Sequence, residues 1–332
     1  MAKRSSGSTL PPLARFVRFY LRSGLRGASR LTYLLSRRFR SLQQVPIDLP
    51  GWKPVYIDMR MGNSHLLLMD APYSGLWREL DEVSVMQRFV REGDVAFDIG
   101  ANIGLHSILL SHLIGAQGRL HAFEPNTELV PALTRTLSNL ENATLHTIAL
   151  SDKDDESTLF VPPDDSMASL KDWTVGTNLR EDVEPRLVTC QQRRMDDLVG
   201  DRLLPQPDFI KCDVEGAELL VFKGGHKTLE RADAPIILFE INRDASGGFG
   251  YGVSGAKDFL AGLQSPRYEF FKVQKGGALE RLEVLTNFMN LLAVPQAKIQ
   301  HWPELVSLLE AGEAATSSVA SENSYSSVDA HG

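Results

Sequence analysis

The sequence predicts an α/β fold in which a mostly parallel, Rossmann-like sheet is flanked by helices. Short apolar runs alternate with stretches of helical periodicity between residues 95 and 240. The first run, at residues 95–99, leads into a glycine turn and then a helix over residues 105–113. An alternation of strand, helix and strand predicts parallel strands joined by right-handed crossovers. Ligands in such sheets bind beyond the carboxyl ends of the strands.

The first 44 residues differ from the rest of the chain in charge. They contain ten Lys or Arg residues and no acid, a net +10, and the whole chain carries −7, which leaves −17 on residues 45–332. Residues 13–40 predict an amphipathic helix with arginines on one face and apolar residues on the other. A helix of this type is typical of an anionic membrane surface. An organellar transit peptide and an ordinary helix docked on the domain remain open.

Residues 45–75 predict a β-hairpin extension between this basic segment and the main domain. Prolines at 46 and 50 indicate a linker, and Gly62-Asn63 is expected to turn between strands at 55–61 and 65–69. A helix over residues 76–91 then leads into the central strand.

The main domain is expected to cover residues 76–300. Further helices are predicted at 126–140, with Asn126 as N-cap, and at 216–230 and 256–263. Further strands are predicted at 120–123, 144–148, 155–161, 186–191, 209–213, 235–240, 268–273 and 287–294. The long loop at 162–182 is expected to be functional. Residues 301–332 are expected to contain a helix end and then a disordered tail.

The glycine turn indicates a nucleotide-like cofactor. A dinucleotide fingerprint requires a glycine where Ala101 stands, and Asp98 would repel a pyrophosphate but would favour a cationic sulfonium. Glu124 follows the next strand, where a carboxylate can bind ribose hydroxyls. These features favour S-adenosylmethionine. The residues assigned to its site are Asp98, Gly100, Ala101, Asn102, Gly104, Glu124, Asp152 and Asp213.

Two carboxylates are expected beside the transferred methyl group. Asp213 and Glu240 end adjacent predicted strands, and Lys211 should point to the same face as Asp213. We assign these three residues to catalysis, with Asp213 as a metal-free general base. A Mg²⁺ site that includes Asn242 is the alternative. The histidines lack a ligand spacing, so His106 and the others are expected to be structural.

Several segments resemble the FkbM family of S-adenosylmethionine-dependent methyltransferases. They read Asp98-Ile-Gly-Ala-Asn-Ile-Gly104, Phe123-Glu-Pro125, Ala149-Leu-Ser-Asp152, Met195-Asp-Asp-Leu198, Ile210-Lys-Cys-Asp-Val-Glu-Gly-Ala-Glu218, Gly224-Gly225 and Leu238-Phe-Glu-Ile-Asn242. The resemblance covers roughly residues 76–295, and Cys212 replaces an aliphatic residue of the family. It implies a class I methyltransferase fold with a seven-stranded sheet, and O-methylation of a hydroxyl on a sugar, glycan or secondary metabolite.

Two other function classes remain open at this stage. One is an NAD-dependent oxidoreductase or epimerase, and the other is a non-catalytic, membrane-associated binding protein. The acidic body argues against a nucleic-acid partner, because phosphate neutralisation supplies most of that affinity. Two cysteines, Cys190 and Cys212, give no disulfide framework. We therefore expect a cytoplasmic protein, with peripheral membrane contact through residues 13–40 and organellar targeting as the alternative.

Overall fold

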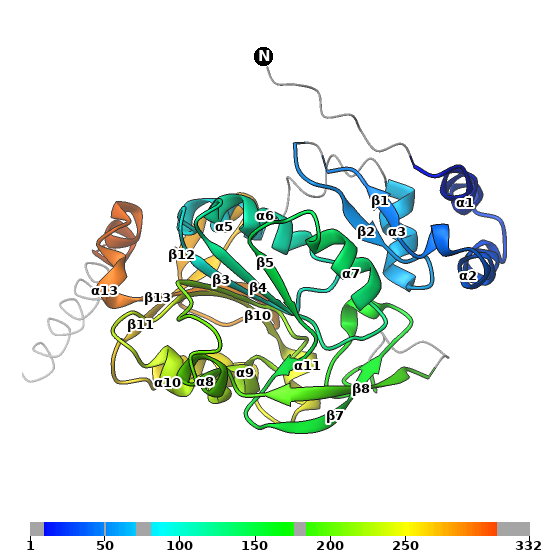
Figure 1. Ribbon diagram of the computed structural model, residues 1–332. Coiled ribbons are helices and arrows are strands. Elements are labelled where there is room, and N and C mark those ends of the chain that lie inside the picture. Colours follow the sequence, from blue (N-terminus) through cyan, green and yellow to red (C-terminus); the bar gives the residue numbers. More distant parts are fainter. Residues whose placement is uncertain (1–9, 50, 71–80, 176–183, 311–332) are drawn as a thin grey trace, which may run out of the picture.

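The computed structural model describes residues 10–49, 51–70, 81–175 and 184–310 (Figure 1). Its helices are α1 (Pro12–Arg22), α2 (Ala28–Arg38), α3 (Gly62–Asp70), α5 (Asp81–Phe89), α6 (Leu105–Ile114), α7 (Val130–Leu137), α8 (Met195–Gly200), α9 (Glu218–Gly224), α10 (His226–Leu229), α11 (Arg243–Gly248), α12 (Gly255–Ala261) and α13 (Gln296–Ile299). The 3₁₀ turns are η1 (Arg40–Leu42), η2 (Asp165–Met167) and η3 (Lys275–Gly277).

The strands form one large and two small sheets. They are β1 (Val45–Ile47), β2 (Val55–Ile57), β3 (Val95–Ile99), β4 (Arg119–Phe123), β5 (Ala143–His146), β6 (Ala149–Leu150), β7 (Asp155–Val161), β8 (Arg186–Arg193), β9 (Phe209–Cys212), β10 (Ile236–Asn242), β11 (Tyr268–Val273), β12 (Leu279–Arg281) and β13 (Phe288–Pro295).

The large sheet confirms the predicted mostly parallel α/β fold. Its eight strands lie in the order β12-β11-β13-β10-β9-β3-β4-β5. The pairs from β10 to β5 are parallel, whereas β13 is antiparallel to both β10 and β11. Strand β11 therefore runs in the direction of the parallel strands, and β13 fills the space between β10 and β11. Strand β12 adds an eighth, edge strand to the seven that were expected.

Both faces of this sheet are covered by helices, as parallel sheets require. Helices α5, α6 and α7 lie on one face, and α8, α9 and α10 lie on the other (Figure 1). Neighbouring residues of one strand accordingly belong to different cores: Ala96 joins one buried cluster, and Phe97 joins the other. This double burial explains why the strands read as apolar runs rather than as alternating patterns.

A three-stranded sheet of order β6-β8-β7 stands beside the carboxyl edge of the large sheet. Strand β7 continues into η2, and Phe160 and Ser169 form an antiparallel bridge that holds this return. Of the long loop predicted at 162–182, residues 162–175 contain η2, and the remainder lies outside the described residues.

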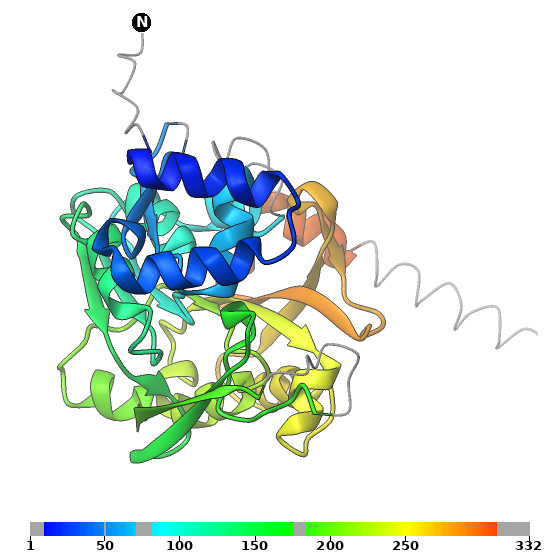
Figure 2. The ribbon, with the colours of Figure 1, turned by 90° about the vertical axis from the view of Figure 1, so that its right-hand side faces the viewer.

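The basic segment forms two helices rather than the single helix that was predicted. Gly24 and Gly27 adopt positive φ angles of 66° and 83°, which a continuous helix does not contain. Helices α1 and α2 contact each other and lie side by side as the outermost layer of one side of the molecule (Figure 2). Ala14, Val17 and Leu21 of α1 are buried in the same core cluster as the large sheet.

The predicted hairpin at 55–69 is wrong. The antiparallel pair is formed by β1 and β2, and so includes Pro46, which was expected to lie in a linker, while residues 62–70 form α3. Leu66, Leu67 and Leu68 are unbranched at Cβ and favour a helix. Gly62 does not form a hairpin turn. It allows the backbone at Pro163 to pack closely against α3, because a Cβ at residue 62 would lie 2.1 Å from the Pro163 carbonyl oxygen.

Two further boundaries differ from the sequence prediction. Helix α7 begins at Val130 and not at Asn126, whose side chain instead accepts a hydrogen bond from the Glu128 N–H. The start of the helix predicted at 76–91 and the part of the predicted tail beyond residue 310 fall outside the described residues.

Candidate active site

A cavity of about 280 Å³ lies at the carboxyl ends of β3, β4 and β9. Its wall is completed by Leu67 of α3 and by residues of β6, β7 and η2, so the small sheet covers the ends of the large one. The cavity is where ligands of parallel α/β sheets bind, as the sequence predicted.

The glycine turn forms the floor of this cavity. Gly100 has a φ of 80°, and a Cβ there would stand 1.8 Å from the Asp213 carbonyl oxygen. Gly104 has a φ of 86° and packs against Leu133 and Thr136 of α7. Glycine is therefore required at both positions, by backbone conformation and by close packing. Gly100, Ala101 and Asn102 line the cavity, as expected, whereas Gly104, which was also assigned to the cofactor site, does not.

Glu124 lies in the cavity wall with only 6% of its surface exposed. Its Oε2 accepts a hydrogen bond from the Asn102 N–H and its Oε1 accepts one from the Asn126 N–H, each at 2.8 Å. Each carboxylate oxygen has two acceptor sites, so one on each oxygen remains for ligand hydroxyls. Burial raises the pKa of Glu124 to about 7, although the two backbone donors oppose this shift.

Asp98 does not point into the cavity, which corrects its predicted role as a direct ligand of the cofactor. It is fully buried and absent from the residues that line the cavity. Its Oδ2 accepts a hydrogen bond from the Ser107 hydroxyl at 2.6 Å, and its Oδ1 lies 3.9 Å from Lys211 Nζ. Asp98 therefore joins the start of α6 to strand β9 behind the glycine turn.

Lys211 connects the glycine turn with the carboxylates. Its Nζ lies 3.2 Å from Asp213 Oδ2 and donates to the Gly100 carbonyl oxygen at 3.3 Å. Burial alone would lower the pKa of Lys211, but the carboxylates of Asp213 and Asp98 outweigh burial and raise it. Lys211 is thus a positioning cation that lies between two acids, and it also lines the cavity.

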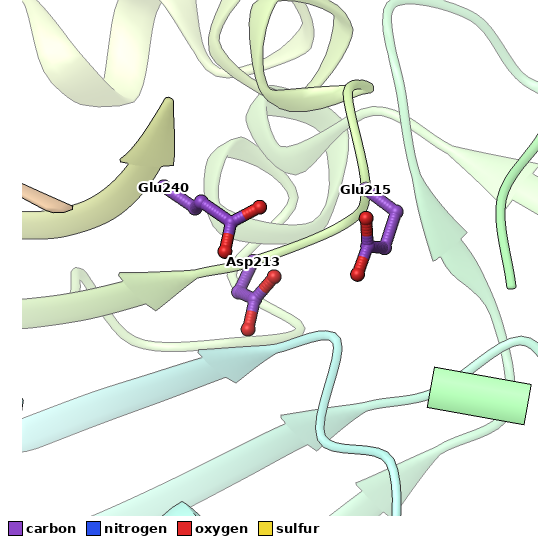
Figure 3. A group of neighbouring side chains, drawn as sticks. All are labelled: Asp213, Glu215 and Glu240. Carbon is purple, nitrogen blue, oxygen red and sulfur yellow. The ribbon is translucent and has the colours of Figure 1, made fainter. Parts of the chain in front are cut away.

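Three carboxylates meet at the edge of the cavity (Figure 3). Oxygens of Asp213, Glu215 and Glu240 lie within 4.8 Å of one another. The register that pairs Phe239 with Cys212 places Glu240 beside Asp213, so the predicted meeting of these two residues is confirmed. Glu215 comes from the turn before α9, where it adopts a positive φ of 51°.

Burial and mutual repulsion raise the pKa values of two members of this acidic group. Burial, and then the charge of Asp213, raises the pKa of Glu240 to about 8. Burial and the charges of Asp213 and Glu240 raise the pKa of Glu215 to about 10. These raised pKa values favour the protonated forms of Glu215 and Glu240 at neutral pH, so each can offer an O–H donor beside the Asp213 carboxylate.

Two residues considered with this group have structural roles. The Asn242 amide oxygen accepts from the Ala245 N–H at 3.2 Å and so caps α11, while Glu215 supplies a third carboxylate beside Asp213 and Glu240. Glu218 is buried, and its carboxylate accepts from the N–H groups of Val214 and Gly216.

Asp152 is not placed at the cavity. Its side chain is exposed, and Ile148, Ala149 and Leu150 line the wall where an adenine contact was predicted. The reason is that β6 ends at Leu150 and Ser151 takes the buried position, so that Asp152 faces solvent.

Sequence reasoning missed three residues of this region. The sequence predicted no site role for Glu215 and a structural role for His106, yet both line the cavity. Burial, with the charge of Lys211, lowers the pKa of His106 to about 3. Glu82 of α5 is held by the Asn290 amide, and burial together with Asp213 raises its pKa. Only Glu215 had a sequence signal, its place in the 210–218 motif.

The family of the chain follows from a match over this whole site. Residues 98–273, more than half of the chain, match the profile of the methyltransferase FkbM domain. The chain belongs to the FkbM methyltransferase family. The match begins at Asp98 and contains the glycine turn, Glu124 and the acidic group, and it gives no support to an NAD-dependent oxidoreductase.

Two curated relatives of similar sequence are methyltransferases by name. The hexuronic acid methyltransferase AglP of Haloferax volcanii is 27% identical over 169 residues, which cover 49% of this chain and 65% of AglP. The 2-O-methyltransferase NoeI of Sinorhizobium fredii is 25% identical over 147 residues, which cover 41% of this chain and 59% of NoeI. The chain therefore spans less than two thirds of either relative.

Solved structures of methyltransferases also resemble the chain at a distance. The O-methyltransferase TomG of Streptomyces achromogenes, solved with S-adenosylmethionine, is 14% identical with a TM-score of 0.36, and the alignment covers 65% of this chain and 78% of TomG. A methyltransferase of Aquifex aeolicus is 16% identical with a TM-score of 0.37, over 69% of this chain and 96% of that protein.

Proposed function

We propose that this protein transfers a methyl group from S-adenosylmethionine to a hydroxyl oxygen of a sugar or glycan. One observation carries the proposal. The cavity has the glycine turn as its floor and the buried Glu124 carboxylate, suited to ribose hydroxyls, in its wall, and it lies beside the three acids Asp213, Glu215 and Glu240. The name of AglP supports a sugar acceptor, and the name of NoeI supports transfer to an oxygen. A hydroxyl of a secondary metabolite is the other acceptor class that the family resemblance suggests.

The residues of the cavity fit S-adenosylmethionine. The absence of a Cβ at Gly100 leaves the floor open, and the free acceptor sites of Glu124 suit two ribose hydroxyls. Apolar Ile148, Leu150 and Leu159 offer a surface for an adenine ring. When bound, this cofactor supplies an electrophilic methyl group on a sulfonium.

The acidic group is proposed to bind the acceptor and to remove its proton. Asp213 accepts the hydroxyl proton, and Lys211 holds the Asp213 carboxylate in place through their 3.2 Å contact. Protonated Glu215 donates a hydrogen bond to an oxygen of the sugar, and Glu240 accepts one through a carboxyl oxygen, which it can do in either protonation state. Orientation of the hydroxyl is the main requirement of an in-line transfer, and these contacts supply it.

The test measures methyl transfer to a panel of hexuronic acids and neutral sugars, with labelled S-adenosylmethionine as donor. In Asp213→Asn we expect a turnover loss of roughly 100-fold or more, the usual scale for removal of a general base, with nearly unchanged cofactor affinity by calorimetry. Full turnover in this variant would move the role of base to another residue.

A Mg²⁺-assisted reaction is the second candidate, and the spacing of the oxygens of Asp213, Glu215 and Glu240 favours it. EDTA discriminates between the two mechanisms. Activity that EDTA removes and Mg²⁺ restores supports the metal, whereas indifference to EDTA supports Asp213 as a metal-free base.

The location of the protein is also a proposal. We propose a cytoplasmic protein peripheral to a membrane, supported by its two unpaired, buried cysteines and by the basic segment at 13–40. No helix in the described part of the chain combines the length and apolar character needed to cross a bilayer. Fractionation of cells that express a tagged chain tests this proposal, and recovery from an organelle would favour a transit peptide.

A further inference from the structure

Exposed apolar side chains are concentrated on one face of the molecule. Of the thirteen large apolar residues exposed in the described chain, eight lie between residues 16 and 66. Phe16, Phe19, Leu25 and Leu34 are exposed by 54%, 75%, 57% and 55% on or between α1 and α2, and Leu66 of α3 is exposed by 60%. We call the outer side of α1 and α2, together with Leu66, the outer helical face. Clustered exposure of this kind marks an interaction site.

The composition of the outer helical face differs from the sequence prediction, which placed arginines on one face and apolar residues on the other. The stripe of Val17, Leu21 and Ala28 is buried against the protein. The outward positions instead interleave apolar residues with seven exposed arginines between residues 15 and 40, and no acid occurs before Asp48. Arg37 lies 5.9 Å from the centroid of the Tyr33 ring, so cations and apolar groups share one surface.

We propose that the outer helical face docks on the headgroup layer of an anionic lipid bilayer. The two helices lie in one layer, so their exposed side chains can reach a flat surface together (Figure 2). Aromatic and leucine side chains then enter the boundary between headgroups and acyl chains, while the arginines contact lipid phosphates.

Charge favours this occupant over the others. A second copy of the chain would bring seven exposed arginines against seven more, which like-charge repulsion opposes. Aliphatic Leu25, Leu34 and Leu66 have no partner on a nucleic-acid backbone, but they do in a bilayer. The net charge of −17 on residues 45–332 is repelled by anionic lipid, which favours an orientation with the basic helices toward the bilayer.

Docking would also place the cavity close to the lipid. Exposed Leu66 lines the groove beside α1 and α2 together with Leu25, and its neighbour Leu67 lines the cavity. Similarly, Pro163 and Asp164 line the groove beside α1 and α2, whereas Asp165 and Ser166 line the cavity. The active site is thus separated from the docking surface by α3 and η2.

The test uses the full chain because α1 belongs to the protein core. It is sedimented with vesicles of phosphatidylcholine, with or without about one third phosphatidylserine. One variant carries Arg15→Gln, Arg26→Gln and Arg30→Gln. A cation near an anionic surface contributes roughly fivefold in binding, so three replacements should lower partitioning about 100-fold. A second variant, with Phe16→Ser, Phe19→Ser and Leu34→Ser, should lose at least about tenfold.

Matched controls replace exposed residues elsewhere: Lys223→Gln, Lys227→Gln and Lys275→Gln for charge, and Leu203→Ser, Val284→Ser and Phe288→Ser for apolar surface. Both should bind like the wild type. A Phe19→Trp variant should show blue-shifted emission only with anionic vesicles. Failure of the wild type to bind, equal binding to neutral vesicles, or equal losses in the controls would overturn the proposal. No outcome depends on methyl transfer.

Discussion

Replacing Lys211 by methionine should strongly destabilise the protein. Met keeps most of the side-chain volume but removes the only cation described near Asp98, which is fully buried. Breaking a buried ion pair from one side typically costs about 3–5 kcal/mol, because the remaining charge has no compensation. Asp213, with 37% of its side chain exposed, can regain water and should contribute little to the loss.

Urea unfolding followed by circular dichroism measures this loss. The double variant Lys211→Met/Asp98→Asn should recover at least about 2 kcal/mol, because the uncompensated charge is then removed. Lys153→Met is the matched control: its 3.2 Å contact with Asp155 is exposed to solvent, so its loss should be far smaller than that of Lys211→Met. If Lys211→Met loses no more than this control, or the double variant recovers nothing, the assigned role of the pair is wrong.

Two other predictions concern carboxylates of the site. Glu124→Ala should weaken S-adenosylmethionine binding by calorimetry at least about tenfold, since each charge-assisted hydrogen bond is worth about 1.5–3 kcal/mol, whereas Asp152→Ala should stay within twofold. For Glu240, the folded pKa of about 8 exceeds the unfolded value, so its stabilising contribution is complete below pH of about 4.5 and is lost as pH rises through about 8. Glu240→Gln should therefore reduce the fall in unfolding free energy between pH 5 and 9, and an unchanged slope would refute the shifted pKa.

The sequence was sufficient for the parallel core and for most of the site. Apolar runs that end in Asp98, Glu124, Asp213 and Glu240 reveal strand ends, and adjacent parallel strands bring such ends together. This reasoning placed Glu124 in the cavity and Asp213 beside Glu240. The reasoning succeeds because right-handed crossovers between parallel strands allow only a few strand orders.

Side-chain direction was not predictable to the same extent. Asp98 precedes the glycine turn, yet hydrogen bonding to Ser107 holds it behind the turn. Asp152 follows a strand end, but burial of Ser151 turns it outward. His106 and Glu82 reach the site from helices, whose rotation depends on tertiary packing rather than on local pattern. The hairpin error at 62–70 arose because a glycine needed for close packing was interpreted as a turn.

The position of β13 has a consequence for how the protein folds during its synthesis. Strands β10 and β11 do not pair with each other, because β13, which follows both in the chain, hydrogen-bonds to each of them. A nascent chain that ends before residue 288 therefore exposes the unpaired edge of β10, and the β11–β12 hairpin lacks its neighbour in the sheet. Ribosome-bound intermediates of that length are the ones for which chaperone protection against edge-to-edge aggregation matters most.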